Sequence, residues 1–196
     1  MIVLVTGGSG SGKSEYAENL AVQLAEVIGA ARRFYVATMD VSDSESRERV
    51  ARHRSMRAGK GFITVEQRTN LGELVERMKG KGEGSSEKKN IFLLEDLTNL
   101  FANEVYLPEG KMKEYAADQK FGMQQMIIKP CLELGELGSL IIVTNEIFSD
   151  GMEYAEETER FIRMMGTLNR ILAMQADGVA EVVCGIPVWQ KGRKPC

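Results

Sequence analysis

A glycine-rich segment near the amino terminus fits the pattern G-x-x-x-x-G-K-[ST], with Gly7, Gly12, Lys13 and Ser14 at its fixed positions. Glycines let a backbone curl so that successive N–H groups point inward and bind phosphate oxygens. The lysine of such a loop reaches the outer phosphates of a nucleotide, and the hydroxyl beside it binds Mg²⁺. The spacing therefore predicts a loop for the triphosphate of a purine nucleotide, GTP or ATP, with contacts from Gly7, Gly8, Ser9, Gly10, Ser11, Gly12, Lys13 and Ser14.

Two neighbouring acids, Glu95 and Asp96, close an apolar run at residues 91–94. Proteins with such a loop usually carry an acid at the end of a neighbouring strand, where it holds Mg²⁺ directly or through water. Because adjacent residues of a strand face opposite sides, we expect one of the two acids to point into the site. Ser14, Glu95 and Asp96 are therefore the candidate metal ligands. The alternative is that the two acids only end the strand and cap the helix that follows.

His53 is the only histidine in the chain, and it lies in an arginine-rich stretch. In a helix, Arg49, His53 and Arg57 would be spaced four residues apart and would share one face. Guanidinium groups can clamp phosphate oxygens and keep a neighbouring imidazole unprotonated, which suits a histidine that attacks phosphorus. On this hypothesis the catalytic residues are Lys13, Arg49 and His53. From the residues alone, a solvated charged helix with an exposed histidine is the more ordinary interpretation.

Apolar runs that look like strands alternate with helical patterns along the chain. The run at 2–6 leads into the glycine-rich loop, and an amphipathic pattern at 14–28 follows, which is the strand–loop–helix context that the motif requires. Several runs are continuously apolar, as in strands covered on both faces. The alternation predicts an α/β fold of the P-loop NTPase type, with a mostly parallel, doubly wound sheet flanked by helices. The expected strands are 2–6, 33–38, 62–66, 91–96, 140–145 and 179–185, and the second long helix is 156–176.

Length and composition are those of one ordinary globular domain: 196 residues, of which 43% are apolar and 27% charged. We expect a single nucleotide-binding domain over 1–196, with a flexible polar loop at about 79–90 and a helical insertion at about 104–120. A formal charge of −3 offers no basic excess for a nucleic acid, so none is expected as a partner. No apolar run approaches the roughly 20 residues that span a bilayer. Without a leader pattern, and with three scattered cysteines, the chain is expected to be cytoplasmic.

Short motifs follow one another along nearly the whole chain, and their ordered set is more specific than the phosphate loop alone. They are residues 6–14 (T-G-G…G-K-S), 35–38 (Y-V-A-T), 43–53 (D-x-E…R-V-x-x-H), 64–66 (T-V-E), 93–98 with Asn103 (L-L-E-D-L-T…N), 143–146 (V-T-N-E), Gly166 with Asn169, 176–177 (A-D) and 185–187 (G-I-P). This set resembles the bifunctional adenosylcobinamide kinase / adenosylcobinamide-phosphate guanylyltransferase family of cobalamin biosynthesis, the CobU family.

The resemblance implies a two-step chemistry on a corrinoid. Such enzymes use a nucleoside triphosphate to phosphorylate the hydroxyl of the aminopropanol arm of adenosylcobinamide. They then take GMP from GTP onto a histidine, release pyrophosphate, and pass the GMP to the new phosphate. The resemblance implies a P-loop fold, Mg²⁺, a corrinoid and GTP or ATP as small-molecule partners, and a homotrimer with active sites between subunits. It favours covalent catalysis by His53 and adds Thr38, Glu66 and Asn145 to Glu95 among the nucleotide-binding residues.

Four places depart from the pattern of the family. Arg52 stands where such chains often carry a first histidine, Asp96 where cysteine is usual, and Arg163 where an acid is usual. Residues 147–153 replace the motif V-G-x-G-I-V-P. These changes bear on guanylyl transfer and corrinoid recognition more than on nucleotide binding. Two alternatives therefore stay open: a diverged P-loop kinase for another small alcohol that has lost guanylylation, and a non-catalytic nucleotide-binding regulator.

Overall fold

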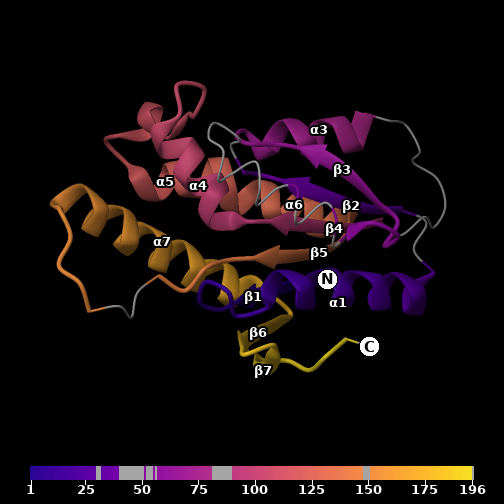
Figure 1. The fold of residues 1–196 in the computed structure, drawn as a ribbon. Helices are drawn as coiled ribbons and strands as arrows, with labels where there is room; N and C mark the ends of the chain where they lie inside the picture. Colours follow the sequence, from indigo (N-terminus) through magenta and orange to yellow (C-terminus); the bar gives the residue numbers. More distant parts are fainter. Residues whose placement is uncertain are drawn as a thin grey trace.

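A central β-sheet with helices on both faces forms the body of the protein (Figure 1). The structure, a computed structural model, describes residues 1–29, 32–39, 51, 55, 57–80, 90–147 and 151–195. Every pair of neighbouring strands is parallel except the last pair, so the predicted mostly parallel α/β sheet is confirmed. The described strands are β1 (Ile2–Thr6), β2 (Arg32–Ala37), β3 (Phe62–Glu66), β4 (Asn90–Glu95), β5 (Gly138–Val143), β6 (Gly178–Val183) and β7 (Ile186–Lys191), in the spatial order β3-β2-β4-β5-β1-β6-β7.

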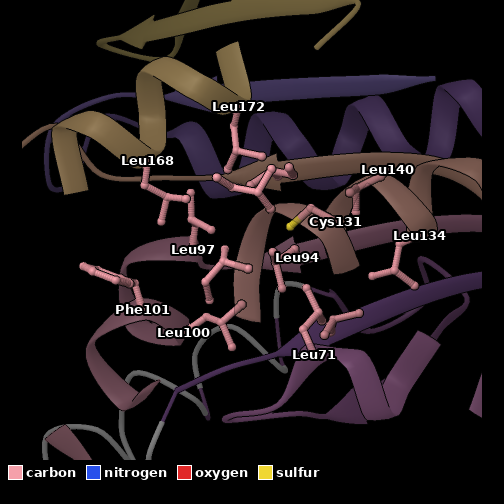
Figure 2. Packing of buried hydrophobic residues seen from close by; sticks show 14 of the residues in the cluster. Leu71, Leu94, Leu97, Leu100, Phe101, Cys131, Leu134, Leu140, Leu168 and Leu172 are labelled. Atoms are coloured by element: carbon pink, nitrogen blue, oxygen red, sulfur yellow. The ribbon is translucent and has the colours of Figure 1, made fainter. Parts of the chain in front are cut away.

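Two buried clusters, one on each face of the sheet, explain why the strand sequences are continuously apolar. In β4, Ile91 and Leu93 pack into the cluster that contains α1 (Lys13–Ile28), whereas Phe92 and Leu94 point into the opposite cluster. Successive side chains of a strand alternate between faces, so a strand covered on both sides needs apolar residues at every position. The opposite cluster is built on α3 (Leu71–Gly80), α4 (Leu97–Tyr106), α6 (Lys129–Leu137) and α7 (Glu156–Gln175), and Figure 2 shows its packing around Leu94, Cys131 and Leu172.

The helix α1 follows the expected amphipathic pattern and starts one residue before its predicted bound. Ala17, Leu20 and Leu24 are buried against the sheet. Gly29 ends the helix in the left-handed conformation, with φ of 63°, and its N–H bonds to the carbonyls of the last turn. A residue without Cβ adopts that conformation without strain, which is why a glycine follows the last helical residue.

The strand order differs from expectation at one place that matters for the site. The strand that carries the two acids, β4, is not the neighbour of β1, because β5 lies between them. The prediction that the acids end a strand next to the P-loop strand is therefore wrong. The order of strands depends on crossover connections between distant segments, and hydrophobic periodicity carries no information about it.

A seventh strand that the sequence analysis missed forms a hairpin with β6. Val183 pairs with Ile186, which leaves Cys184 and Gly185 as a two-residue turn. Both turn residues have positive φ, 51° and 80°, as a type I′ turn requires. The signal that could have revealed the hairpin is the glycine at 185 between two short apolar runs.

The remaining segments are short. Most of the predicted flexible loop, 81–89, lies outside the described residues; its flanks belong to α3 and β4. The predicted insertion at 104–120 contains the end of α4, the 3-10 helix η1 (Met112–Tyr115) and the start of α5 (Gln119–Met123), which the π-helix η2 (Gln124–Ile128) joins to α6. In the part of the chain that the structure describes, no helix is both long enough and apolar enough to cross a bilayer.

Candidate active site

The glycine-rich loop connects β1 directly to α1. Gly12 lies just before the helix in a left-handed conformation, with φ of 88°, and the N–H of Ser11 donates to the carbonyl of Gly8 (3.2 Å). The Lys13 ammonium folds back over the loop and donates to the same Gly8 carbonyl (3.0 Å). The loop therefore places a lysine, a helix amino terminus and curled backbone N–H groups around one point, which is the environment that binds phosphate.

Two close approaches explain why the loop needs glycine where it meets the β6–β7 hairpin. A Cβ on Gly7 would lie 2.6 Å from the carbonyl oxygen of Val182, and one on Gly12 would lie 3.2 Å from the Cα of Gly185. The N–H of Gly185 donates to the carbonyl of Ser11 (2.8 Å). The hairpin turn thus supports the phosphate loop from the side, a contact that the sequence analysis did not foresee.

Glu95 is the acid that contacts the phosphate loop. The Ser14 hydroxyl donates to its Oε1 (2.7 Å), while its Oε2 is buried and accepts no hydrogen bond from any described residue. Burial, and next the neighbouring Asp96, raise the pKa of Glu95 to about 8, against the opposing effects of the Ser14 hydrogen bond and the Lys13 charge. A carboxyl group with one orphaned oxygen beside a serine hydroxyl and a lysine is suited to hold a cation that the nucleotide brings with it.

Asp96 has a different set of contacts. It is the amino-terminal cap of α4: its Oδ1 accepts from the Asn99 N–H (2.7 Å), and its Oδ2 accepts from the Asn145 amide (3.1 Å). Burial raises the pKa of Asp96, and these hydrogen bonds oppose the shift. The structure therefore separates the two acids, with Glu95 on the P-loop and Asp96 on the helix cap that had been the alternative for both.

Thr38 and Asn103 join the ends of β2 and β4. The Thr38 hydroxyl accepts from the Asp96 N–H (2.7 Å) and lies 3.0 Å from the Glu95 carbonyl oxygen. The carbonyl of Thr38 accepts from the Asn103 amide (2.7 Å). Thr38, Asn103 and Asp96 are all buried. The hydroxyl of Thr38 therefore holds the backbone that carries both acids, instead of reaching toward the phosphate loop.

The other predicted residues lie farther out or outside the described part of the chain. Glu66 ends β3, an edge strand beyond β2, and its side chain is exposed. Arg49 and His53 lie outside the described residues. Arg57, four positions after His53, is described: its guanidinium lies 3.5 Å from the centre of the Tyr35 ring, on the α1 side of the sheet.

The donor set fits a magnesium ion bound together with a nucleotide. In the described ranges, no group of three or more His, Cys, Asp or Glu side chains converges on a possible metal site. Magnesium commonly takes only one or two protein oxygens and fills its octahedron with water and phosphate oxygens. The Ser14 hydroxyl and the orphaned Glu95 oxygen are two such donors, placed beside the loop where the phosphates would lie.

The fold is shared with P-loop proteins of known structure. The chain is similar to a DnaB-like replicative helicase, with a TM-score of 0.52 and 12% identity over 92% of this chain and 46% of that chain. It is also similar to a solved ATPase domain, with a TM-score of 0.51 and 10% identity over 92% of this chain and 68% of that chain. Identities this low show the fold alone, and the predicted P-loop NTPase class is confirmed.

The sequence identifies the family within that class. Residues 3–189 match the family model of cobinamide kinase / cobinamide phosphate guanyltransferase, so the chain belongs to this family, as its motifs predicted. It is 29% identical over 194 residues to the bifunctional adenosylcobalamin biosynthesis protein CobU of Escherichia coli (strain K12), covering 96% of this chain and 98% of that one. It is 27% identical over 190 residues to the corresponding protein CobP of Pseudomonas aeruginosa, covering 96% of each. The chain is a transferase of this class.

The raised pKa of Glu95 predicts a pH-dependent cost to stability in protein free of metal and nucleotide. Between the unfolded value near 4.5 and the folded value of about 8, the folded state binds one more proton than the unfolded state, so the free energy of unfolding falls as pH rises. Glu95→Gln removes that dependence, and the variant should gain a few kcal/mol on wild type between pH 5 and pH 9. Urea denaturation with a chelator present measures it.

Glu15→Gln is the matched control. It removes an exposed carboxylate from the first turn of α1, the helix that Glu95 contacts through Ser14, and leaves the buried carboxyl group in place. It should not reproduce the gain in stability of Glu95→Gln. If wild type and Glu95→Gln gave parallel pH profiles, the pKa of Glu95 would not be raised in the folded protein.

Proposed function

We propose that this chain phosphorylates the hydroxyl of adenosylcobinamide and then transfers GMP from GTP to the resulting phosphate, through a guanylyl-histidine intermediate. The observation that carries the proposal is the contact of Ser14 with Glu95 at 2.7 Å beside Lys13, in a chain of the cobinamide kinase family. Such a cluster has the groups that position and neutralise a triphosphate. The diverged kinase and the regulator, the two alternatives, have no specific feature of the described site in their favour.

In the kinase step the protein mainly positions and neutralises the triphosphate. The acceptor oxygen bonds to the γ-phosphorus, the bond to the β–γ bridging oxygen breaks, the nucleoside diphosphate leaves, and the hydroxyl proton passes to solvent. Lys13 and the loop N–H groups of residues 7–14 hold the phosphates. Ser14 and Glu95 are the proposed ligands of Mg²⁺, which when bound neutralises charge on the β- and γ-phosphates. Asp96 is not needed as a ligand, because its oxygens already accept hydrogen bonds from Asn99 and Asn145.

The guanylyl step is proposed to use His53 with Arg49. An imidazole nitrogen bonds to the α-phosphorus of GTP, the bond to the bridging oxygen breaks, and pyrophosphate leaves. The acceptor phosphate then attacks the same phosphorus, the P–N bond breaks, and the imidazole is released. Arg49 stabilises the charge on the α-phosphate. Arg57 anchors the chain just after this segment, since its guanidinium lies against Tyr35 in the buried layer beside α1.

The family resemblance also supports a homotrimer, with the corrinoid bound near a subunit boundary, and the three scattered cysteines support a place in the cytoplasm. Thr38 and Glu66 complete the proposed nucleotide site, Thr38 by holding the Glu95 backbone and Glu66 from the same edge of the sheet. Asn145 lies at that edge as well, near the nucleotide or the acceptor hydroxyl. All strands but β7 run parallel, so their carboxyl ends meet at this edge, which is where ligands bind in open α/β sheets.

Lys13→Ala should weaken GTP and ATP binding by roughly 10- to 100-fold, because it removes the charge that contacts the outer phosphates. Because the Lys13 side chain is buried, the thermal unfolding temperature is measured alongside, to show that the variant is folded at the temperature of the binding assay. Isothermal calorimetry measures the affinity. Lys79→Ala, which removes an exposed lysine of α3 that pairs with Glu133 of α6, is the control and should bind both nucleotides like wild type. Unchanged affinity in Lys13→Ala would overturn the phosphate assignment.

His53→Ala should abolish the protein–GMP adduct and leave phosphorylation of adenosylcobinamide within about threefold of wild type. The chain has one histidine, so no other imidazole can substitute. Incubation with α-labelled GTP, followed by mass mapping of acid-labile label, measures the adduct, and labelled product measures the kinase. An adduct that persists in His53→Ala, or none in wild type, would remove His53 from the mechanism and favour a kinase that lacks the second step.

A further inference from the structure

Hydrogen bonds to both oxygens fix the orientation of the Asp96 carboxylate. Its Oδ1 accepts the N–H of Asn99 at the start of α4 (2.7 Å), and its Oδ2 accepts from two side-chain amides, those of Asn145 (3.1 Å) and Asn99 (3.3 Å). The Thr38 hydroxyl accepts the N–H of Asp96 itself (2.7 Å). A carboxylate only accepts hydrogen bonds, so each partner must turn a donor toward it.

This requirement sets the orientation of the Asn145 amide. An asparagine side chain has one donor end and one acceptor end, and the hydrogen-bond network decides which way it faces. Asn145 turns its Nδ2 toward Asp96, so its carbonyl oxygen Oδ1 faces the other way. Among the described residues, none donates a hydrogen bond to that oxygen, and Asn145 is only partly buried. Asn145 therefore offers a free hydrogen-bond acceptor.

The position of Asn145 puts this acceptor between the phosphate loop and the acids. Asn145 lies just beyond the carboxyl end of β5, the strand between β1 and β4. Its own N–H donates to the Thr98 hydroxyl (3.2 Å), and the N–H of the next residue, Glu146, donates to the carbonyl of Gly7 (3.0 Å). Backbone contacts on both sides hold Asn145 in place, so its amide can rotate but the residue cannot move away.

We propose that Asp96 is a positioning residue that holds the Asn145 carbonyl oxygen toward the site, where it accepts a hydrogen bond from the hydroxyl of the alcohol that is phosphorylated. The chemistry of the oxygen decides between candidate partners. An acceptor repels the oxygens of the nucleotide phosphates and binds a donor, and the attacking alcohol is the donor that must stand beside the γ-phosphate. The inference rests on the proposed kinase step and adds the group that orients its acceptor.

Asp96→Asn tests the inference because it keeps the cap of α4 and forces the Asn145 amide to turn around. Asparagine caps a helix about as well as aspartate, so its Oδ1 can still accept the Asn99 N–H. Its Nδ2 then faces Asn145, which must rotate to present its carbonyl and turn a donor toward the site. The KM for adenosylcobinamide should rise roughly 10- to 100-fold, with the Kd for Mg-nucleotide within about threefold of wild type.

Two further variants show whether Asp96 acts through Asn145. Asn145→Ala should show the same loss, and Asp96→Asn added to it should cost nothing more, because the residue being oriented is gone. Asp96→Asn combined with Asn145→Asp should lower the KM most of the way back to the wild-type value. One oxygen of the carboxylate at position 145 then accepts from the amide at position 96, and the other faces the site. Asn99→Ala removes the other amide on the same carboxylate oxygen and is the matched control, with a KM near that of wild type.

A measurement that does not depend on catalysis tests the inference separately from the proposed function. The Nδ2 hydrogens of Asn145, followed by NMR in nucleotide-free protein, should exchange slowly in wild type and rapidly in Asp96→Asn. Rapid exchange in wild type overturns the inference, and so does a full additional loss from Asp96→Asn in the Asn145→Ala background. If wild type phosphorylates no corrinoid while its amide hydrogens are protected, the proposed function fails and the orientation of Asn145 stands.

Discussion

The hydrogen bond from Ser14 to Glu95 joins the two parts of the site that the chain keeps 81 positions apart. Ser14 begins the helix after the phosphate loop, and Glu95 ends a strand that is separated from β1 by β5. Glu95 shares its face of β4 with Ile91 and Leu93, which pack into the α1 cluster, so its side chain meets the helix on that face. Burial of this carboxyl group disfavours its charged form. The geometry that would suit a cation beside a triphosphate is thus held at a cost in stability when neither is bound.

Polar contacts among strand ends make this edge of the sheet rigid. Thr38 at the end of β2 bonds to the backbone of Glu95 and Asp96, Asn103 bonds to the carbonyl of Thr38, and Asn145 beyond β5 bonds to Asp96. A buried polar group left without a partner is costly, so the loss of one member leaves others unsatisfied. Three strands and one helix therefore share a single network, and the positions of both acids depend on it.

A second set of charged contacts ties the stretch after His53 to α1, the helix that follows the phosphate loop. Lys60 donates to Glu18 (2.8 Å), which is buried on α1, and the Arg57 guanidinium stacks on Tyr35 of β2. A buried carboxylate needs such a partner, because an isolated charge in the interior is expensive. The residues that follow the proposed nucleophile are therefore anchored one turn of α1 beyond Ser14, close to the phosphate loop.

Local chemistry in the sequence determined the parts of the site that need only neighbouring residues. The strand–loop–helix at residues 2–28 follows from an apolar run, the conformational freedom of glycine and a 3.6-residue period, all of which act over a few positions. The six predicted strands and the P-loop class were evident for the same reason, and the family was evident from the order of short motifs along the chain. Tertiary structure alone decided that β5 separates β1 from β4, that Glu95 and not Asp96 meets Ser14, and that the Asn145 amide turns its nitrogen toward Asp96. The last two depend on partners 81 and 49 positions apart. The order of strands brings these partners together, and no local pattern encodes that order.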